Sequence, residues 1–341
     1  MKKVVTFGEI MLRLATPDYQ RFVQAETFEA TYGGGEANVA VSLAHFGLDS
    51  AFVTAVPDND IGQAAINHLR RFGVSTGSIL KVKGARLGIY FLESGASQRP
   101  SQVIYDRSPS AIAGIEENAF DWKAIFAGAD WFHFTGITPA LGDRVAEETL
   151  RACRMAKSCG LTVSCDLNYR KKLWSREKAQ AVMSGLMPYV DVVVANEEDA
   201  EMVFGIQAKQ SDIVKGTIDD EGYREVAREL KARFDLKYVA ITLRESISAS
   251  ENGWSGLMYD GSEFYRSRRY LMHIVDRVGG GDAFAGGLIY AFLKELSPRE
   301  TVEFAAAASC LKHTVHGDFN MVKVSEVMTL AAGDESGRVQ R

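Results

Sequence analysis

The chain has 341 residues, of which 46% are hydrophobic and 24% charged, a composition typical of a soluble globular protein with a sizeable core. Its 39 basic and 44 acidic side chains leave a net charge of −5. A protein that neutralises phosphate backbones would carry a basic excess, so this balance argues against nucleic acid as a partner.

We expect neither a targeting signal nor a membrane-spanning segment. Glu9 interrupts the only apolar run near the start, so we expect no signal peptide. The longest nearly apolar run, 283–293, has about half the roughly 20 residues of a membrane span. The spacing of the four cysteines matches no zinc or redox motif, which favours reduced thiols. We therefore expect a cytoplasmic protein that contacts no membrane.

Strand-like apolar runs alternate with helix-like amphipathic stretches along most of the chain. The strand-like runs are Val4–Phe7, Trp131–Phe134, Leu161–Cys165, Val190–Ala195 and Tyr238–Thr242, and the amphipathic stretches include 144–158, 176–187 and 223–233. This alternation predicts an α/β fold, a mainly parallel central sheet with helices on both faces. Ligands of such sheets bind outside the carboxyl ends of the strands, so the loops that follow the strands are candidate binding segments.

Two segments, about 11–32 and 86–111, break this alternation and predict β structure without helices. The second contains the strand-like runs Leu87–Glu93 and Gln102–Arg107. We expect both segments to form a small β-sheet inserted into a single domain, 1–341, where it would act as a lid. Because strand edges favour self-association, a homodimer or higher homo-oligomer through this lid is also expected.

The most informative segment is DRVGGGDAFA, which begins at Asp276. Its three glycines, Gly279, Gly280 and Gly281, allow a sharp turn that presents N–H groups at the start of a helix, where anions bind. The carboxylate of Asp282 beside such a cradle can accept a proton from a hydroxyl while the cradle holds the phosphoryl group under attack. The alternative is a glycine-rich turn whose aspartate only caps the helix.

Two signatures carry a family resemblance. DRVGGGD resembles the C-terminal signature of the ribokinase/PfkB family of sugar kinases, commonly D-T-x-G-A-G-D, and YGGGEANVA at 32–40 resembles its N-terminal signature. The resemblance covers nearly the whole chain. It implies a ribokinase-like fold, ATP and Mg²⁺ as cofactors, Asp282 as catalytic base and the backbone of 279–281 as anion hole. Arg277 stands where threonine is usual, which leaves open a monovalent cation such as K⁺ near Asp276.

The N-terminal signature predicts contacts with the sugar. Gly34 and Gly35 would bring the backbone close to sugar hydroxyls, and Asn38, one turn into the next helix, would supply an amide. The alternative is a strand-to-helix turn in which these residues have only a capping role.

Side chains of the expected lid indicate an acidic substrate. Alternate residues of a strand share a face, so Val103, Tyr105 and Arg107 point the same way, and we expect Tyr90 to join them across the hairpin. Such a face is costly to bury without a ligand, and a guanidinium suits a carboxylate. Arg170, after a predicted strand, would approach the same acid. The alternatives are an edge-strand charge for Arg107 and an exposed basic turn for Arg170.

Within the family, three segments are most similar to 2-keto-3-deoxygluconate kinases: IYDRS at 104–108, DLNYR at 166–170 and KHTVHGDFN at 312–320. This similarity implies phosphorylation of the terminal primary hydroxyl of that sugar acid by ATP, which gives the 6-phosphate, with the carboxylate held by arginine. A fructokinase or another neutral-sugar kinase of the family is the first alternative. A non-catalytic sugar or nucleotide sensor on the same fold is a more remote one.

The resemblance places the nucleotide near the loops that follow the later strands. Asn196 comes directly after a predicted strand, and Glu197 or Asp199 is a candidate for holding Mg²⁺, Glu197 through water, although helix capping by these residues is the alternative. The strand Tyr238–Thr242 would lead into the adenosine pocket, followed by a turn longer than the family usually has. The candidate nucleotide-binding residues are Asn168, Asn196, Thr242, Arg244, Gly279 and Gly281.

Overall fold

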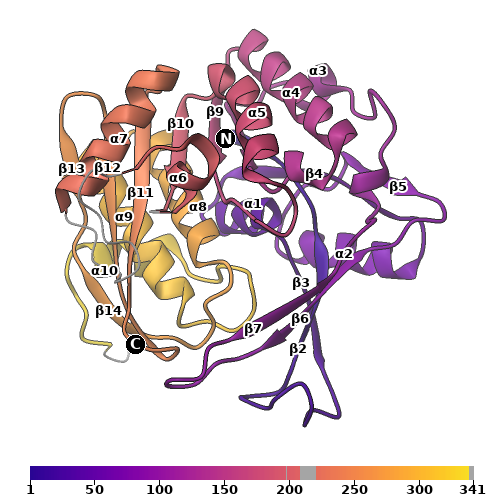
Figure 1. The fold of residues 1–341 in the computed structure, drawn as a ribbon, viewed down its shortest axis with the longest axis horizontal. Coiled ribbons are helices and arrows are strands. Elements are labelled where there is room, and N and C mark those ends of the chain that lie inside the picture. Colours follow the sequence, from indigo (N-terminus) through magenta and orange to yellow (C-terminus); the bar gives the residue numbers. More distant parts are fainter. Residues whose placement is uncertain (197, 208–219, 338–341) are drawn as a thin grey trace.

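The computed structural model describes residues 1–196, 198–207 and 220–337, and within them the main element is a ten-stranded sheet (Figure 1). Its order is β13–β12–β11–β10–β9–β8–β1–β4–β5, and β14 pairs with β12. The strands from β11 to β5 run parallel, whereas β12 pairs antiparallel with its neighbours. The strands are β1 (Lys3–Phe7), β4 (Asp49–Pro57), β5 (Ile79–Val82), β8 (Trp131–Thr135), β9 (Thr162–Asp166), β10 (Val192–Ala195), β11 (Tyr238–Ser246), β12 (Glu251–Tyr259), β13 (Phe264–Arg266) and β14 (Tyr270–His273).

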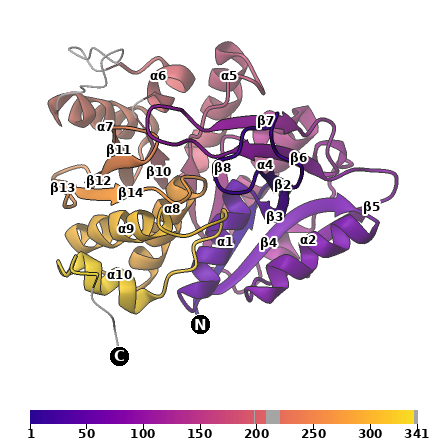
Figure 2. The same ribbon diagram turned by 90° about the horizontal axis from the view of Figure 1, so that it is seen from below.

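Helices cover both faces of this sheet because its strands are apolar on both sides. Val5 and Phe7 of β1 pack into one core with α4, α5 and α7, while Val4 packs into a second core with α1, α8 and α9. Figure 2 shows α8 and α9 on one side of the sheet and α5 and α7 on the other. The predicted α/β architecture is therefore confirmed. The helices are α1 (Gly35–His45), α2 (Asp60–Arg71), α3 (Trp122–Ile125), α4 (Asp143–Ser158), α5 (Arg176–Leu186), α6 (Asp199–Phe204), α7 (Asp220–Phe234), α8 (Gly280–Leu293), α9 (Pro298–Lys312) and α10 (Val324–Ala331), with single 3₁₀ turns at Ile112–Gly114, Pro139–Leu141 and Met187–Tyr189.

The length and apolar character of these helices bear on whether the chain could span a membrane. Throughout the described ranges, none of them is both long enough and apolar enough to cross a bilayer. The cytoplasmic location stays a prediction.

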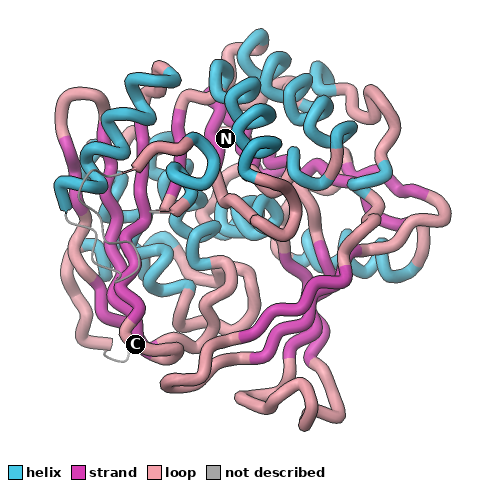
Figure 3. The backbone as a smooth tube through the Cα atoms, in the orientation of Figure 1, coloured by secondary structure: helices cyan, strands magenta, loops and turns pink. Residues whose placement is uncertain are grey.

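The two segments that break the alternation form a separate four-stranded sheet, which projects from the body (Figures 1 and 3). Its order is β3–β2–β6–β7, with β2 and β6 parallel at the centre and an antiparallel strand on each side. The strands are β2 (Met11–Ala15), β3 (Glu29–Gly33), β6 (Gly88–Glu93) and β7 (Gln102–Asp106). The expected small inserted sheet is thus present, and its function as a lid stays a prediction.

One strand is longer than the sequence predicts. β11 continues past Thr242 to Ser246 because the residues from Leu243 onward pair with Asn252–Ser255 of β12. Arg244 therefore lies in a strand, opposite Trp254, and the connecting turn is short. Hydrogen bonds across a hairpin outweigh the polar composition of this segment, which had indicated a loop.

Candidate active site

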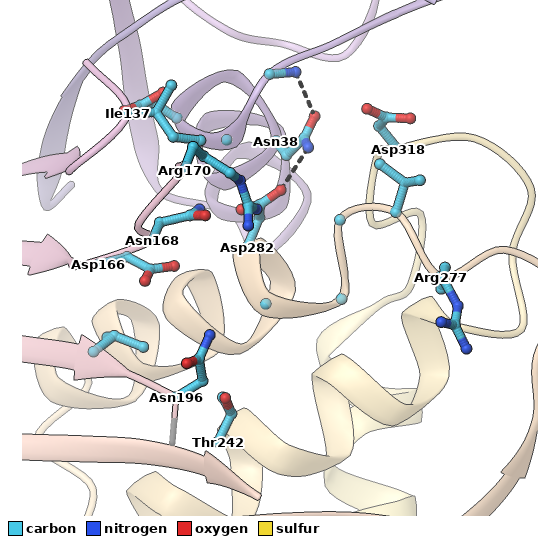
Figure 4. Close-up of a pocket in the computed structure, with 18 of the residues that line it drawn as sticks. Asn38, Ile137, Asp166, Asn168, Arg170, Asn196, Thr242, Arg277, Asp282 and Asp318 are labelled. Atoms are coloured by element: carbon cyan, nitrogen blue, oxygen red, sulfur yellow. Dashed lines mark hydrogen bonds between the residues drawn. The ribbon is translucent and has the colours of Figure 1, made fainter. Parts of the chain in front are cut away.

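A cavity of about 460 Å³ lies where the carboxyl ends of β9, β10 and β11 meet the start of α8 and one face of the small sheet (Figure 4). All the candidate site residues predicted from the sequence line it, except Glu197, which lies outside the described residues. The fold thus brings together residues from both signatures and from the small sheet. Those that line the cavity are Gly34, Gly35, Asn38, Tyr90, Tyr105, Arg107, Asn168, Arg170, Asn196, Thr242, Arg244, Gly279, Gly280, Gly281 and Asp282.

The glycine run forms the start of α8, and no described side chain caps it. Gly279 has φ +85°, and a Cβ there would lie 2.1 Å from the carbonyl oxygen of Asp318. A Cβ on Gly280 would lie 2.3 Å from the His313 ring, whereas one on Gly281 would meet nothing within 4 Å. Two of the three glycines are thus needed for close packing of this loop. The uncapped helix start leaves N–H groups able to bind an anion.

Asp282 lies in the first turn of α8 and is joined to the N-terminal signature. The side-chain amide of Asn38 donates a hydrogen bond of 2.6 Å to its carboxylate, and the backbone N–H of Gly34 donates to Oδ1 of Asn38 at 3.2 Å (Figure 4). Burial raises the pKa of Asp282 to about 7, with smaller contributions from the Asp318 and Glu36 carboxylates, while Asn38 and Arg170 oppose the rise. A carboxylate with this pKa suits a general base at neutral pH.

Asp166, the last residue of β9, is another buried carboxylate that lines the cavity near Asp282, and sequence reasoning missed it. Burial raises its pKa well above the usual range, and the neighbouring carboxylates of Asp199 and Asp282 raise it further. Its place at the carboxyl end of a parallel strand was a signal that could have identified it. Carboxylates gathered in this way favour a bound cation.

The part of the cavity around Asp166 fits Mg²⁺ if the phosphates of ATP supply most of the ligands of the ion. In the described part of the chain, no three His, Cys, Asp or Glu side chains are placed to hold a metal ion between them. Mg²⁺ in kinases is commonly held by one or two carboxylates, water and the substrate phosphates. Asp166, Glu198 and Asp199 are described acids that line this side of the cavity and could serve it.

Arg107, which the sequence analysis expects to hold the substrate carboxylate, has partners within the protein. Its guanidinium forms an ion pair with Glu9 and lies over the ring of Tyr105, 5.4 Å from the ring centre. Both partners are largely buried, and Oε1 of Glu9 and Nε of Arg107 have no hydrogen-bond partner among the described residues. Sequence reasoning missed Glu9 because its partner lies 98 residues away. The pair is nearly neutral, with one acceptor and one donor still unused.

Tyr90 pairs with Tyr105 across the hairpin as predicted, with ring centres 6.0 Å apart. Its hydroxyl, however, donates a 2.5 Å hydrogen bond to Asp318 and is buried. Asp318 and Asp276 also hold Arg13 of β2, at 2.6 and 2.5 Å. Tyr90 therefore presents its ring to the cavity rather than its hydroxyl, and this buried cluster joins the small sheet to the α8 loop.

Arg170 is the arginine that remains available to a ligand. It is exposed, points toward Asp282 (Figure 4), and lowers the pKa of both Asp166 and Asp282 by its charge. In the described part of the chain its guanidinium forms no ion pair and no hydrogen bond, although its backbone carbonyl accepts from the Leu173 N–H at 2.9 Å. A guanidinium placed in this way can bind a carboxylate.

On the side of the cavity formed by β10 and β11, part of the polar capacity is used within the protein. Oδ1 of Asn196 accepts hydrogen bonds from the backbone N–H groups of Glu198 and Asp199, each 2.9 Å, so its amide oxygen is engaged just before α6. The Thr242 hydroxyl donates to the Ala195 carbonyl at 3.5 Å. Arg244 is exposed at the cavity.

Comparison with known proteins assigns the family. Residues 1–324 match the model of the pfkB family of carbohydrate kinases. The chain is 52% identical to a 2-dehydro-3-deoxygluconokinase from Thermotoga maritima of known crystal structure, with a TM-score of 0.93 over 98% of this chain and 100% of that one. It is 36% identical to a 2-dehydro-3-deoxygalactonokinase from Haloferax volcanii over 98% of each chain, and 28% identical to fructokinase-1 from Zea mays over 92% of each. The ribokinase-like fold and the sugar-kinase activity predicted from the sequence are confirmed, and the chain belongs to the pfkB family of carbohydrate kinases.

Proposed function

We propose that this kinase transfers the terminal phosphoryl group of ATP to the terminal primary hydroxyl of 2-keto-3-deoxygluconate, which gives the 6-phosphate. The observation that carries the proposal is the position of Asp282 between the start of α8 and the guanidinium of Arg170, neither of which has a side-chain partner among the residues that the structure describes. A base, an anion cradle and a carboxylate anchor thus line one cavity.

In this proposal Asp282 accepts the proton of the attacking hydroxyl, and Asn38 holds the carboxylate in place. The N–H groups at 279–281 bind the phosphoryl group as its negative charge shifts during transfer. Mg²⁺, when bound with ATP, neutralises phosphate charge. The nucleotide would lie along Asn168, Asn196, Thr242 and Arg244, and Mg²⁺ would face Asp166 and Glu198.

The sugar acid would lie beneath the small sheet, which acts as a lid in this proposal. Arg170 binds the carboxylate, while the guanidinium of Arg107, which also lines the cavity, contacts a hydroxyl or the keto oxygen of the substrate. The Tyr105 ring covers the carbon chain. Exclusion of water by this sheet matters because water would compete with the sugar hydroxyl as acceptor.

A neutral-sugar kinase is the second candidate, and the same arginine distinguishes it. Arg170 also faces Asp166 and Asp282, so its charge could serve only to balance theirs. A fructokinase would then keep its affinity for fructose without this guanidinium. The relative from Zea mays is a fructokinase by name, so fructose is the neutral sugar to test first.

The test is ATP turnover with Mg²⁺ on 2-keto-3-deoxygluconate, 2-keto-3-deoxygalactonate, fructose and ribose. We expect turnover of the acids alone and its loss in Asp282→Asn. Arg170→Ala should raise the KM for the acid about tenfold or more, since a charged hydrogen bond contributes about 1.5–3 kcal/mol. Lys172→Ala, a nearby exposed residue outside the cavity lining, is the matched control. A preference for fructose that is unchanged in Arg170→Ala would refute the proposal that the substrate is a sugar acid.

We also propose that the kinase is a homodimer joined through the small sheets. The face of this sheet opposite Tyr105 carries apolar side chains from three strands, among them Leu14, Phe91 and Ile104, and Ile104 is 53% exposed. A second copy of the same face would cover them. Light scattering should give the mass of a dimer, and Ile104→Glu should shift it to a monomer. A monomeric wild type would refute the proposal.

A further inference from the structure

Lys312 is a buried cation that the proposed mechanism does not use. It is the last residue of α9 and fully buried. Its Nζ donates hydrogen bonds to two backbone carbonyls, those of Asp276 at 3.2 Å and Val315 at 3.4 Å. A Cβ on Gly279 would lie 3.3 Å from its Cε. The side chain therefore lies directly behind the loop whose N–H groups form the start of α8.

A free monovalent cation near Asp276, which the family resemblance left open, does not fit the residues present. One carboxylate oxygen of Asp276 accepts from Arg13 at 2.5 Å and from the Gly317 N–H at 3.1 Å, and the other accepts from the Val278 N–H at 3.1 Å. The carbonyl of the same residue is bound by Lys312. The oxygen atoms that would replace the hydration shell of K⁺ are thus already in use.

The charges of this cluster point in the same direction. The carboxylates of Asp276 and Asp318 face two cationic side chains, Arg13 and Lys312, so the buried cluster is balanced without an added ion. Lys312 also stands at the carboxyl end of α9, where the helix dipole favours a positive charge. A further cation would bring a third positive charge next to Asp276 and Asp318, while Asp282, which also acts on Lys312 by its charge, lies on the cavity side of the loop.

We infer that Lys312 is a positioning residue that takes the place of a free monovalent cation: its ammonium ties the Asp276 and Val315 carbonyls together and so fixes the anion-binding loop. An ammonium group donates up to three hydrogen bonds and can therefore bridge carbonyl groups as a small cation does. The inference rests on the proposed function insofar as 279–281 bind the transferred phosphoryl group. It follows that the activity does not depend on K⁺.

The test compares wild type, Lys312→Ala and Lys312→Met in KCl, NH₄Cl, NaCl and tetramethylammonium chloride at constant ionic strength. Wild-type kcat should be equal in all four. In tetramethylammonium chloride, Lys312→Ala should lose about 100-fold in kcat with a smaller change in KM, as expected when a catalytic loop is misplaced. KCl or NH₄Cl should restore at least about tenfold, because a small cation enters the space left by the side chain. Lys312→Met fills that space and should not respond.

Thermal melting without substrates gives a second readout that does not depend on the sugar. The melting temperature of Lys312→Ala should rise with KCl concentration, since a cation that binds only the folded chain stabilises it. The melting temperatures of wild type and of Lys123→Ala, an exposed lysine of α3, should not.

Two results would overturn the inference: stimulation of wild type by K⁺ several-fold over tetramethylammonium, or wild-type kcat in Lys312→Met. If neither variant folds, the wild-type cation series decides alone. If none of the tested sugars is phosphorylated, the proposed function fails, while the melting series still tests the replacement of Lys312 by a cation.

Discussion

The pH dependence of the reaction tests the role of Asp282 most directly. Only its ionised form can accept a proton, and its pKa is raised to about 7. At pH 6 about a tenth of the molecules would carry the ionised base, so kcat/KM should fall about tenfold for each pH unit below 7 and level off above it. The assay is kcat/KM for the sugar from pH 5 to 9, with the coupling enzymes in excess.

The hydrogen bond from Asn38 determines how far the midpoint of this pH profile should move when Asn38 is replaced. Its amide donates to the carboxylate at 2.6 Å and so favours the ionised form of Asp282. A hydrogen bond to a charged group contributes about 1.5–3 kcal/mol, and one pKa unit corresponds to about 1.4 kcal/mol. Because the carboxylate is partly exposed to the cavity, we expect Asn38→Ala to move the midpoint of the profile upward by about one unit.

The matched control is Ser42→Ala, one turn further along α1, where the Ser42 hydroxyl bonds the Asn38 carbonyl and does not touch Asp282. Its profile should keep the wild-type midpoint. A wild-type profile that stays flat from pH 5 to 8 would refute the assignment of Asp282 as the titrating base. A downward shift in Asn38→Ala would refute the sign of the hydrogen-bond argument.

Two further substitutions test the loop behind the base. Arg13→Met should lower the free energy of unfolding in urea by about 3–5 kcal/mol, because it leaves Asp276 and Asp318 buried without their cation; a loss below about 1 kcal/mol would contradict this account. Gly279→Ala should lower both the free energy of unfolding and kcat, since its Cβ would lie 2.1 Å from a carbonyl oxygen. The matched control, Gly281→Ala, has open space around its Cβ and should keep wild-type stability. Equal effects of the two substitutions would contradict the steric argument.

The fold was predictable because its signals are local. The apolar runs that form β1, β8, β9, β10 and β11 can be identified within windows of five or six residues, and the structure confirms all five. The predicted end of β11 was wrong because the last residues of this strand are held by pairing with β12, which their own composition does not indicate. Pairing across a hairpin is a property of two segments, and the propensity of one of them does not contain it.

The candidate site was predictable where a loop carries its own chemistry, as in the glycine run before Asp282. It was not predictable where distant segments form ion pairs. Arg107 carried the signal of a carboxylate anchor, but its partner, Glu9, lies 98 residues away and looked only like an interruption in an apolar run. Lys312 is the last residue of a helix whose composition does not indicate that its ammonium is buried.

The long separations within the site restrict how the chain can form it. Asn38 and Asp282 are 244 residues apart, and Arg13 and Asp318 are 305 apart. Each pair joins the two ends of the chain, and closing loops of this length costs conformational entropy that only the packed core can offset. Neither half of the chain alone would hold Asp282 beside its amide partner. The base and its anion cradle should therefore become active together, when α1 and α8 pack against each other.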